Sequence, residues 1–63
     1  MYQVTLEAAR RNKKYTQKEA ANLVGVSAST IKNWEKGRTQ PTQKKIKRLC
    51  EVYDVSYDAI FFG

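Results

Sequence analysis

The sequence predicts an all-α fold, a compact bundle of about five short helices. Three residues that favour helix N-caps, Thr16, Ser27 and Thr42, each stand directly before a stretch with apolar residues at helical spacing. Gly25 and Gly37 follow two of these stretches, and glycine is the residue that favours the C-terminal end of a helix. The alternation of β-branched residues that strands need is absent. These observations favour short helices joined by turns.

The chain is short, and we expect residues 1–63 to form a single domain. A chain of 63 residues buries only a small core, so efficient helix packing or a partner has to supply stability. The sequence contains no histidine and one cysteine, Cys50, so we expect no metal site and no disulfide. We expect Cys50 to act as a small buried apolar side chain.

The charge balance is strongly basic, because twelve lysines and arginines against six acidic residues give a net charge of +6. This charge favours a polyanionic partner, either nucleic acid or an acidic membrane surface, although a merely basic soluble surface explains it too. No apolar run approaches the ~18 residues of a transmembrane helix, and the start of the chain lacks the apolar stretch of a signal peptide. We therefore expect a cytoplasmic protein.

The first helix is expected from about Thr5 to Asn12, with Leu6 and Ala9 facing inward. The basic run at residues 10–14 closes this helix, because cations are favourable at a helix C-terminus.

The second helix is expected to begin after Thr16, which forms a capping box with Glu19, and to end at Gly25. Its expected inner face consists of Ala20, Ala21, Leu23 and Val24.

The third helix is expected from its cap at Ser27 to about Lys36, and residues 38–41 form a loop after it. Thr42 caps a fourth helix, whose apolar residues follow helical spacing: Ile46, Leu49, Cys50 and Tyr53. Ser56 is expected to cap a short fifth helix, with Asp58 in its first turn and Ile60 and Phe61 behind it.

Three residues of the second and third helices form the pattern that points to function. Two short helices that cross closely at a steep angle need a small residue at the contact, here Ala21. The turn between them needs a residue that accepts a positive φ, here Gly25, and Ile31 fills the angle between the helices. A helix, a short glycine-containing turn and a helix form the helix-turn-helix unit that reads DNA. We place this unit at about residues 16–36.

Further residues carry a family resemblance over nearly the whole chain. The matching stretches, in order, are Leu6–Arg10, Thr16-Gln17 with Ala21, Gly25-Val26-Ser27, Thr30-Ile31, Trp34-Glu35-Lys36-Gly37, Pro41-Thr42 and Val55-Ser56. In these the chain resembles the helix-turn-helix domain of the lambdoid phage repressor and Cro family, also called the Xre family. The resemblance implies a lambda-repressor-like fold. It also implies a transcriptional regulator, a repressor or a Cro-like protein, that binds a two-half-site operator in double-stranded DNA through the major groove.

The sequence departs from the family pattern at four positions. Lys14 and Asp54 stand where the family often has glycine at a helix end, so each is strained if the backbone keeps a positive φ there. Ala9 and Ala20 replace larger aliphatic residues. We therefore expect a thin core that aromatic side chains fill, namely those of Tyr15, Trp34 and Tyr53.

The outer face of the third helix is the expected base-reading surface. At ~100° per residue, Ile31 and Trp34 point inward while short and polar side chains spread over the opposite arc. The expected base contacts are Ala28, Ser29, Lys32 and Asn33. An ordinary solvated helix face is the alternative interpretation.

The expected phosphate contacts surround this helix. Gln17 stands at the start of the second helix, where unpaired backbone N–H groups favour an anion. Lys44 is a cation in a first helical turn, which the helix dipole disfavours, so we expect it to serve a group outside the helix. The full expected set is Gln17, Thr30, Lys36, Arg38, Thr39, Gln40 and Lys44. Lys47 and Arg48 are expected to be ordinary solvated charges.

The resemblance also implies an ion pair between Arg10 and Glu35, which would join the first and third helices. The chain is further expected to bind DNA as a homodimer, because its last seven residues are richer in apolar side chains than a small core can bury. The expected dimer contacts are Tyr57, Ile60, Phe61 and Phe62.

Other classes of function fit the sequence less well. Catalysis is disfavoured because the chain has no histidine, no glycine-rich phosphate loop and only scattered carboxylates. A membrane partner is disfavoured because the cations do not gather along one amphipathic helix. No cofactor or small-molecule ligand is expected. A protein-interaction module of the same fold, such as an antitoxin, an antirepressor target or a coactivator, remains an alternative. The operator, the direction of regulation and the extent of the whole protein stay open.

Overall fold

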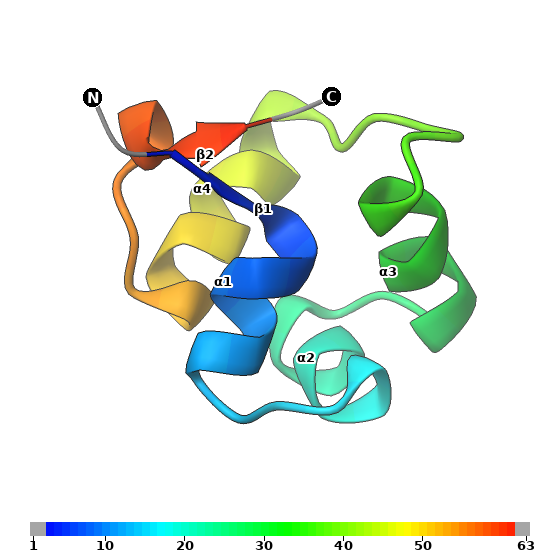
Figure 1. Ribbon diagram of the computed structural model, residues 1–63. Helices are drawn as coiled ribbons and strands as arrows, with labels where there is room; N and C mark the ends of the chain where they lie inside the picture. Colours follow the sequence, from blue (N-terminus) through cyan, green and yellow to red (C-terminus); the bar gives the residue numbers. More distant parts are fainter. Residues whose placement is uncertain (1–2, 62–63) are drawn as a thin grey trace.

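A computed structural model describes residues 3–61 of the chain, and residue 61 by its backbone alone. Within this range, α-helices surround one hydrophobic core, and a 3-10 helix and two very short strands complete the fold (Figure 1). In chain order the elements are β1 (Val4–Thr5), α1 (Leu6–Asn12), α2 (Gln17–Val24), α3 (Ala28–Glu35), α4 (Gln43–Tyr53), η1 (Tyr57–Ala59) and β2 (Ile60–Phe61). None of the helices in the described part has the length and apolarity needed to cross a membrane.

The helices begin where the sequence predicts, because each has a hydroxyl side chain as its N-cap. The Oγ1 of Thr5 accepts the backbone N–H of Ala8 at 3.1 Å, and the Oγ1 of Thr42 accepts that of Lys45 at 3.3 Å. Such a bond satisfies one of the N–H groups that the first helical turn leaves unpaired. The capping box of α2, between Thr16 and Glu19, is complete.

Helices α2 and α4 each end at a residue with a left-handed backbone conformation. Gly25 closes α2 with a φ of 89°, and Asp54 closes α4 with a φ of 55°. Lys14, in the turn after α1, has a φ of 62°. The backbone thus keeps a positive φ at both non-glycine positions, which was the condition for strain there, and each of them adopts a conformation that costs an L-residue about 1–2 kcal/mol.

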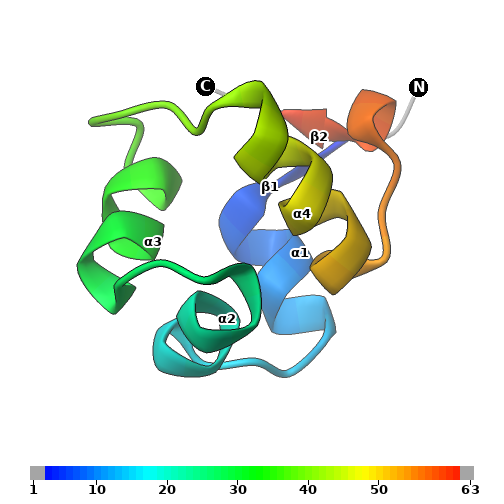
Figure 2. The same ribbon diagram turned by 180° about the vertical axis from the view of Figure 1, so that it is seen from behind.

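The core is small and is built around the crossing of α2, α3 and α4. Ile31 of α3 and Leu49 of α4 are its largest fully buried side chains, each 1% exposed. Ala9 and Ala20 are fully buried, so the helices that carry them approach closely. Figure 2 shows α4 lying across α1 on the face opposite to the view of Figure 1. Tyr53 is buried, and Tyr15 and Trp34 pack against the core, as the thin aliphatic core requires.

Two expectations about the C-terminal part are corrected by the structure. The fifth helix is a single 3-10 turn, and Ser56 at its start makes no side-chain capping bond. The chain also contains a parallel strand pair, in which Val4 pairs with Ile60 and Thr5 with Phe61. Strands of two residues are too short to show an alternating pattern, so the sequence could not reveal them.

The expected inner face of α2 is also corrected at one position. Leu23 is 42% exposed, whereas Ala20, Ala21 and Val24 are buried. The small side chains let α2 pack closely on both α3 and α4. Its buried stripe is therefore narrower than the apolar stretch in the sequence, and Leu23 falls outside it.

Candidate nucleic-acid interface

The turn between α2 and α3 fixes the geometry of the helix-turn-helix unit. The backbone N–H groups of Gly25 and Val26 both donate to the carbonyl of Ala21, at 2.8 and 2.9 Å. Ala21 and Ile31 are buried where the two helices meet. A Cβ built on Gly25 would meet no atom within 4 Å, so the positive φ and not the available space favours glycine here.

Arg48 of α4 also holds this unit, which corrects the expectation that it is an ordinary solvated charge. Its Nε donates to the carbonyl of Leu23 at 3.1 Å, and its Nη1 lies 3.5 Å from a carboxylate oxygen of Glu51. The carbonyls in the last turn of a helix have no partner within that helix, so Arg48 caps the C-terminal end of α2. The spacing to Glu51 is visible in the sequence, but the contact with α2 depends on the fold.

The outer face of α3 is open to solvent. Both overall views place α3 at an edge of the molecule (Figures 1 and 2). Ala28, Ser29 and Lys32 are exposed and Asn33 is half-buried. Within the described residues, the side chains of Ser29, Lys32 and Asn33 make no hydrogen bond or ion pair, so their polar atoms are available to a ligand.

Cations without carboxylate partners continue this face into the following loop and α4. From residue 28 to residue 48 the chain carries seven lysines and arginines and a single acidic residue, Glu35. Within residues 3–61, Lys36, Arg38 and Lys44 are exposed and form no ion pair. Thr39 and Gln40 are exposed in the same loop.

Two of the expected phosphate-contacting residues are already engaged within the protein. The hydroxyl of Thr30 is half-buried and lies 2.9 Å from that of Ser27. The side-chain amide of Gln17, also half-buried, donates to a carboxylate oxygen of Glu35 at 3.1 Å. The contact between Gln17 and Glu35 had no signal in the sequence, because it joins residues that only the tertiary structure brings together.

Beside Gln17, the structure places Arg10 of α1 against Glu35 of α3, as the resemblance implied. The Arg10 Nε lies 2.6 Å from Glu35 Oε2, and the two side chains are 9% and 5% exposed. The hydrogen bond to Glu35 raises the pKa of Arg10 above its ordinary value. Arg10 also donates from Nη1 to the carbonyl of Tyr15 at 2.8 Å. This pair is therefore buried and fully hydrogen-bonded, which is the condition under which a buried ion pair is tolerated.

Tyr53 of α4 is buried near the same ion pair. Burial raises its pKa to about 12, and the negative charge of Glu35 acts in the same direction while Arg10 opposes it. The phenol is therefore neutral at physiological pH, so its hydroxyl adds no charge beside Glu35.

Comparison with known proteins assigns the family. A family model described as helix-turn-helix matches residues 6–60. The chain belongs to the Cro/C1-type helix-turn-helix family. This assignment confirms the all-α, lambda-repressor-like fold class and identifies the chain as a non-enzymatic domain.

The relatives of this Cro/C1-type chain are regulators by name. It is 35% identical over 54 residues, 86% of its own length, to the HTH-type transcriptional regulator DicA of Escherichia coli (strain K12). It is 34% identical over 53 residues, 84% of its length, to the HTH-type transcriptional regulator ImmR of Bacillus subtilis (strain 168). The chain spans 40% and 42% of these two relatives. It is 29% identical over 58 residues to the HTH-type transcriptional activator BcrR of Enterococcus faecalis, covering 92% of the chain and 28% of that relative. No solved structure gives a significant match.

The structure corrects one of the four residues expected to form the dimer contact of this Cro/C1-type domain. Ile60 is 4% exposed and belongs to the core, so its side chain is not available to a partner. Tyr57 is 53% exposed. The side chain of Phe61 and the whole of Phe62 lie outside the described residues.

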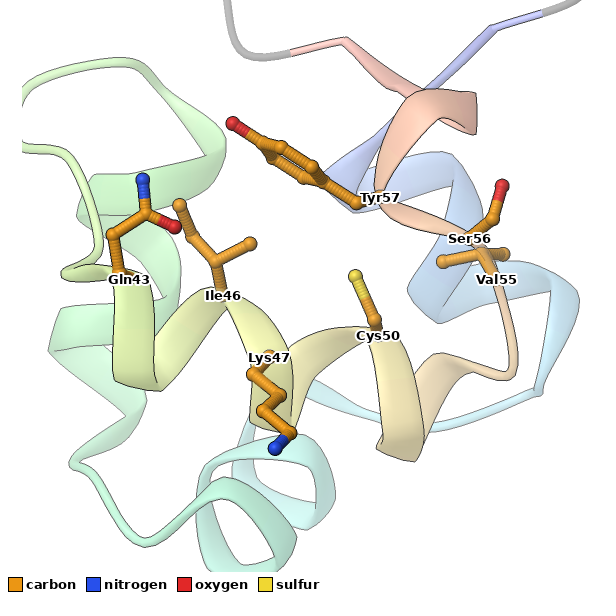
Figure 3. A pocket seen from close by; sticks show the side chains of 7 residues that line it. All are labelled: Gln43, Ile46, Lys47, Cys50, Val55, Ser56 and Tyr57. Atoms are coloured by element: carbon orange, nitrogen blue, oxygen red, sulfur yellow. The ribbon is translucent and has the colours of Figure 1, made fainter.

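A groove of about 300 Å³ runs between α4 and η1 beside Tyr57. Ile46, Cys50 and Tyr57 point into it, whereas Lys47 extends away from it (Figure 3). Its lining consists of Gln43, Ile46, Lys47, Cys50, Val55, Ser56 and Tyr57. Burial raises the pKa of the Cys50 thiol, so Cys50 is a neutral apolar wall of the groove and not a reactive thiolate.

Proposed function

We propose that this chain binds double-stranded DNA sequence-specifically and regulates transcription, as a repressor or a Cro-like protein, by placing α3 in the major groove. The observation that carries the proposal is the open outer face of α3, whose polar side chains have no partners within the described residues. The fold supplies a helix of suitable exposure, and the cations beside it supply the attraction to a polyanion.

Sequence reading is assigned to α3. Asn33 presents an amide that can pair with adenine in two hydrogen bonds, and Ser29, one turn before it, can serve several base edges. Lys32 can reach a guanine or a phosphate, and Ala28 offers a methyl group to a thymine methyl.

Affinity is assigned to the residues that surround α3. Within the described residues, Lys36, Arg38 and Lys44 form no ion pair, and further hydrogen-bonding groups come from Gln17, Thr30, Thr39 and Gln40. Contacts to phosphate position a protein on the duplex but carry no direct sequence information. These side chains are therefore expected to strengthen binding to every sequence alike.

The test compares Asn33→Ala with Lys44→Ala on a DNA site selected from random duplexes and on a random duplex. Asn33→Ala should cost ~1–3 kcal/mol on the selected site only and relax the preference at one base pair of each half-site. Lys44→Ala should weaken binding to both DNAs and lower the slope of affinity against salt by roughly 1. Lys13→Ala is the matched control, because Lys13 pairs with Asp54 at the ends of α1 and α4.

Equal weakening of both DNAs by Asn33→Ala would contradict base reading by α3. Salt-insensitive binding to a protein, without binding to DNA, would favour the protein-interaction module instead. The names of the relatives include a transcriptional activator, so a reporter assay on the selected site is needed to separate repression from activation.

We further propose that the protein occupies its operator as a homodimer through the surface of Tyr57, Phe61 and Phe62. A two-fold contact there would set two copies of α3 about one DNA turn, ~34–36 Å, apart. Phe62→Asp should abolish cooperative binding to a two-half-site operator while leaving binding to a single half-site unchanged. Unchanged cooperativity would place the dimer contact elsewhere.

A further inference from the structure

We propose that the groove between α4 and η1 is a docking site for an acidic peptide segment of a partner protein, which inserts one bulky apolar side chain beside Ile46 and pairs a carboxylate with Lys47. None of the residues assigned to DNA contacts lines this groove, so the inference goes beyond the proposed function and does not rest on it. An occupied groove gives the DNA-bound domain a second partner.

Ile46 presents apolar surface that the fold itself does not use. It is half-buried and points into the groove (Figure 3), but within the described part of the chain it belongs neither to the core nor to the partly buried side chains packed against the core. Cys50 and Val55 also line the groove, and both do pack against the core. An aliphatic side chain contributes to affinity in proportion to the apolar area that binding removes from water. Ile46 is therefore the contact point for an apolar side chain of the partner.

The shape of the groove favours a peptide over a small molecule. Its volume of about 300 Å³ lies at the lower limit of small-molecule pockets. Much of its lining is exposed, namely Gln43, Lys47, Ser56 and Tyr57. A small molecule here would keep much of its surface in water, whereas small-molecule sites bury most of the ligand. A peptide has to bury only its anchor side chain, because its other residues make contacts along the rim.

The charge at the rim selects an acidic segment. Among the described residues that line the groove, Lys47 is charged and none is acidic. The ammonium of Lys47 is exposed and forms no ion pair within residues 3–61, unlike the neighbouring Arg48, which pairs with Glu51. Its stem lines the groove and its ammonium extends outward from the edge (Figure 3). A carboxylate next to the apolar anchor therefore meets the ammonium at the rim, where opposite charges favour association and fix the orientation of the partner.

The groove stays accessible when α3 lies in the major groove of DNA. Both overall views place α3 and η1 on opposite sides of the molecule, with α4 between them (Figures 1 and 2). The peptide and the duplex therefore occupy different faces of the domain and can be bound together.

The experiment selects peptides on the full chain from a phage-displayed library of random short segments and measures their affinity by fluorescence anisotropy. The selected peptides should carry a bulky apolar residue with an aspartate or glutamate within one helical turn of it. Ile46→Ala, shown to be folded by circular dichroism, should weaken their binding about 10-fold or more, because the anchor loses its apolar contact. Lys47→Ala should weaken it about 2–5-fold and make it less sensitive to salt. Lys36→Ala is the matched control, an exposed lysine without an ion pair in the described range, and it should leave peptide affinity unchanged.

A second measurement locates the peptide without a mutation. Cys50 is the one cysteine of the chain and lines the groove. Its alkylation by iodoacetamide at alkaline pH, where the thiolate forms, can be followed by mass spectrometry. Saturating peptide should suppress this alkylation, whereas a saturating DNA duplex should leave its rate unchanged.

Several outcomes would overturn the inference. Recovery of no peptide, or of peptides without an acidic residue, would refute the chemistry of the partner. Displacement of the peptide by DNA, weakening by Lys36→Ala or unchanged alkylation of Cys50 would place the binding outside the groove. Tyr57 also belongs to the proposed dimer contact, so loss of self-association in Ile46→Ala by sedimentation equilibrium would make a second copy the occupant. All these outcomes leave DNA binding by α3 intact, and failure to bind any duplex would overturn the proposed function alone.

Discussion

Replacing Arg10 by methionine tests how far the buried ion pair stabilises the fold. The change keeps an unbranched apolar stem but removes every donor that Arg10 supplies. The Glu35 carboxylate, 5% exposed, would keep only its bond from Gln17, and the carbonyl of Tyr15 would lose the 2.8 Å bond from Arg10. Breaking a buried pair in this way costs about 3–5 kcal/mol, because an uncompensated charge remains buried.

This cost is large for a chain of 63 residues, whose total stability is expected to be roughly 3–9 kcal/mol. Urea unfolding followed by circular dichroism at low temperature measures it. Arg11→Met is the matched control, because Arg11 is 71% exposed and pairs with Glu7 one helical turn away. Such surface pairs contribute about 0.5 kcal/mol or less. If Arg10→Met does not fold at all, Arg10→Lys keeps the charge without the paired donors and should show an intermediate loss.

A loss below about 0.5 kcal/mol for Arg10→Met, equal to that of Arg11→Met, would show that the pair behaves as a surface pair. That result would refute the reasoning from burial.

Three further predictions concern stability. Lys14→Gly should raise the free energy of unfolding by about 1 kcal/mol in urea, because glycine adopts the observed φ of 62° without strain, and any loss would contradict this. Tyr53 has a pKa of about 12 when folded and about 10 when unfolded. Its contribution to the free energy of unfolding is therefore complete below pH 10 and is lost as the pH rises through 12. The loss reaches about 3 kcal/mol at most, and Tyr53→Phe should remove this part of the pH dependence. Arg48→Met should cost about 1 kcal/mol through the freed carbonyl of Leu23, whereas Lys47→Met should cost nothing measurable in the same assay.

The features that the sequence predicts well depend on neighbouring residues. N-caps, the capping box and the left-handed helix ends are set by side chains within one turn of the helix end. The positions of Thr16 at the start of α2 and of Gly25 at its end therefore follow from the local sequence, whereas Asp54 was expected at a helix end from the family resemblance. The exposure of the outer face of α3 was predictable because helical periodicity fixes which residues oppose the buried Ile31.

The features that the sequence did not reveal depend on contacts between distant segments. The exposure of Leu23 follows from how closely α2 and α4 approach, and the bond from Arg48 joins residues 25 positions apart. The bond between Gln17 and Glu35 spans 18 positions. No periodicity or spacing encodes such pairs. An exposed Gln17 and a half-buried Gln17 bonded to Glu35 are equally compatible with the sequence pattern.

The parallel pairing of β1 with β2 has a consequence for the order in which the fold assembles. Contacts between α2 and α3 close only a short loop, whereas pairing Val4 with Ile60 has to close almost the entire described chain. The entropy cost of closure rises with the length of the loop, and such contacts become favourable only after the intervening helices have packed. The strand pair is therefore the last element to form and the first to open. The amide hydrogens of the strand pair should exchange with solvent through local openings, whereas those of the helix-turn-helix unit should exchange only through global unfolding.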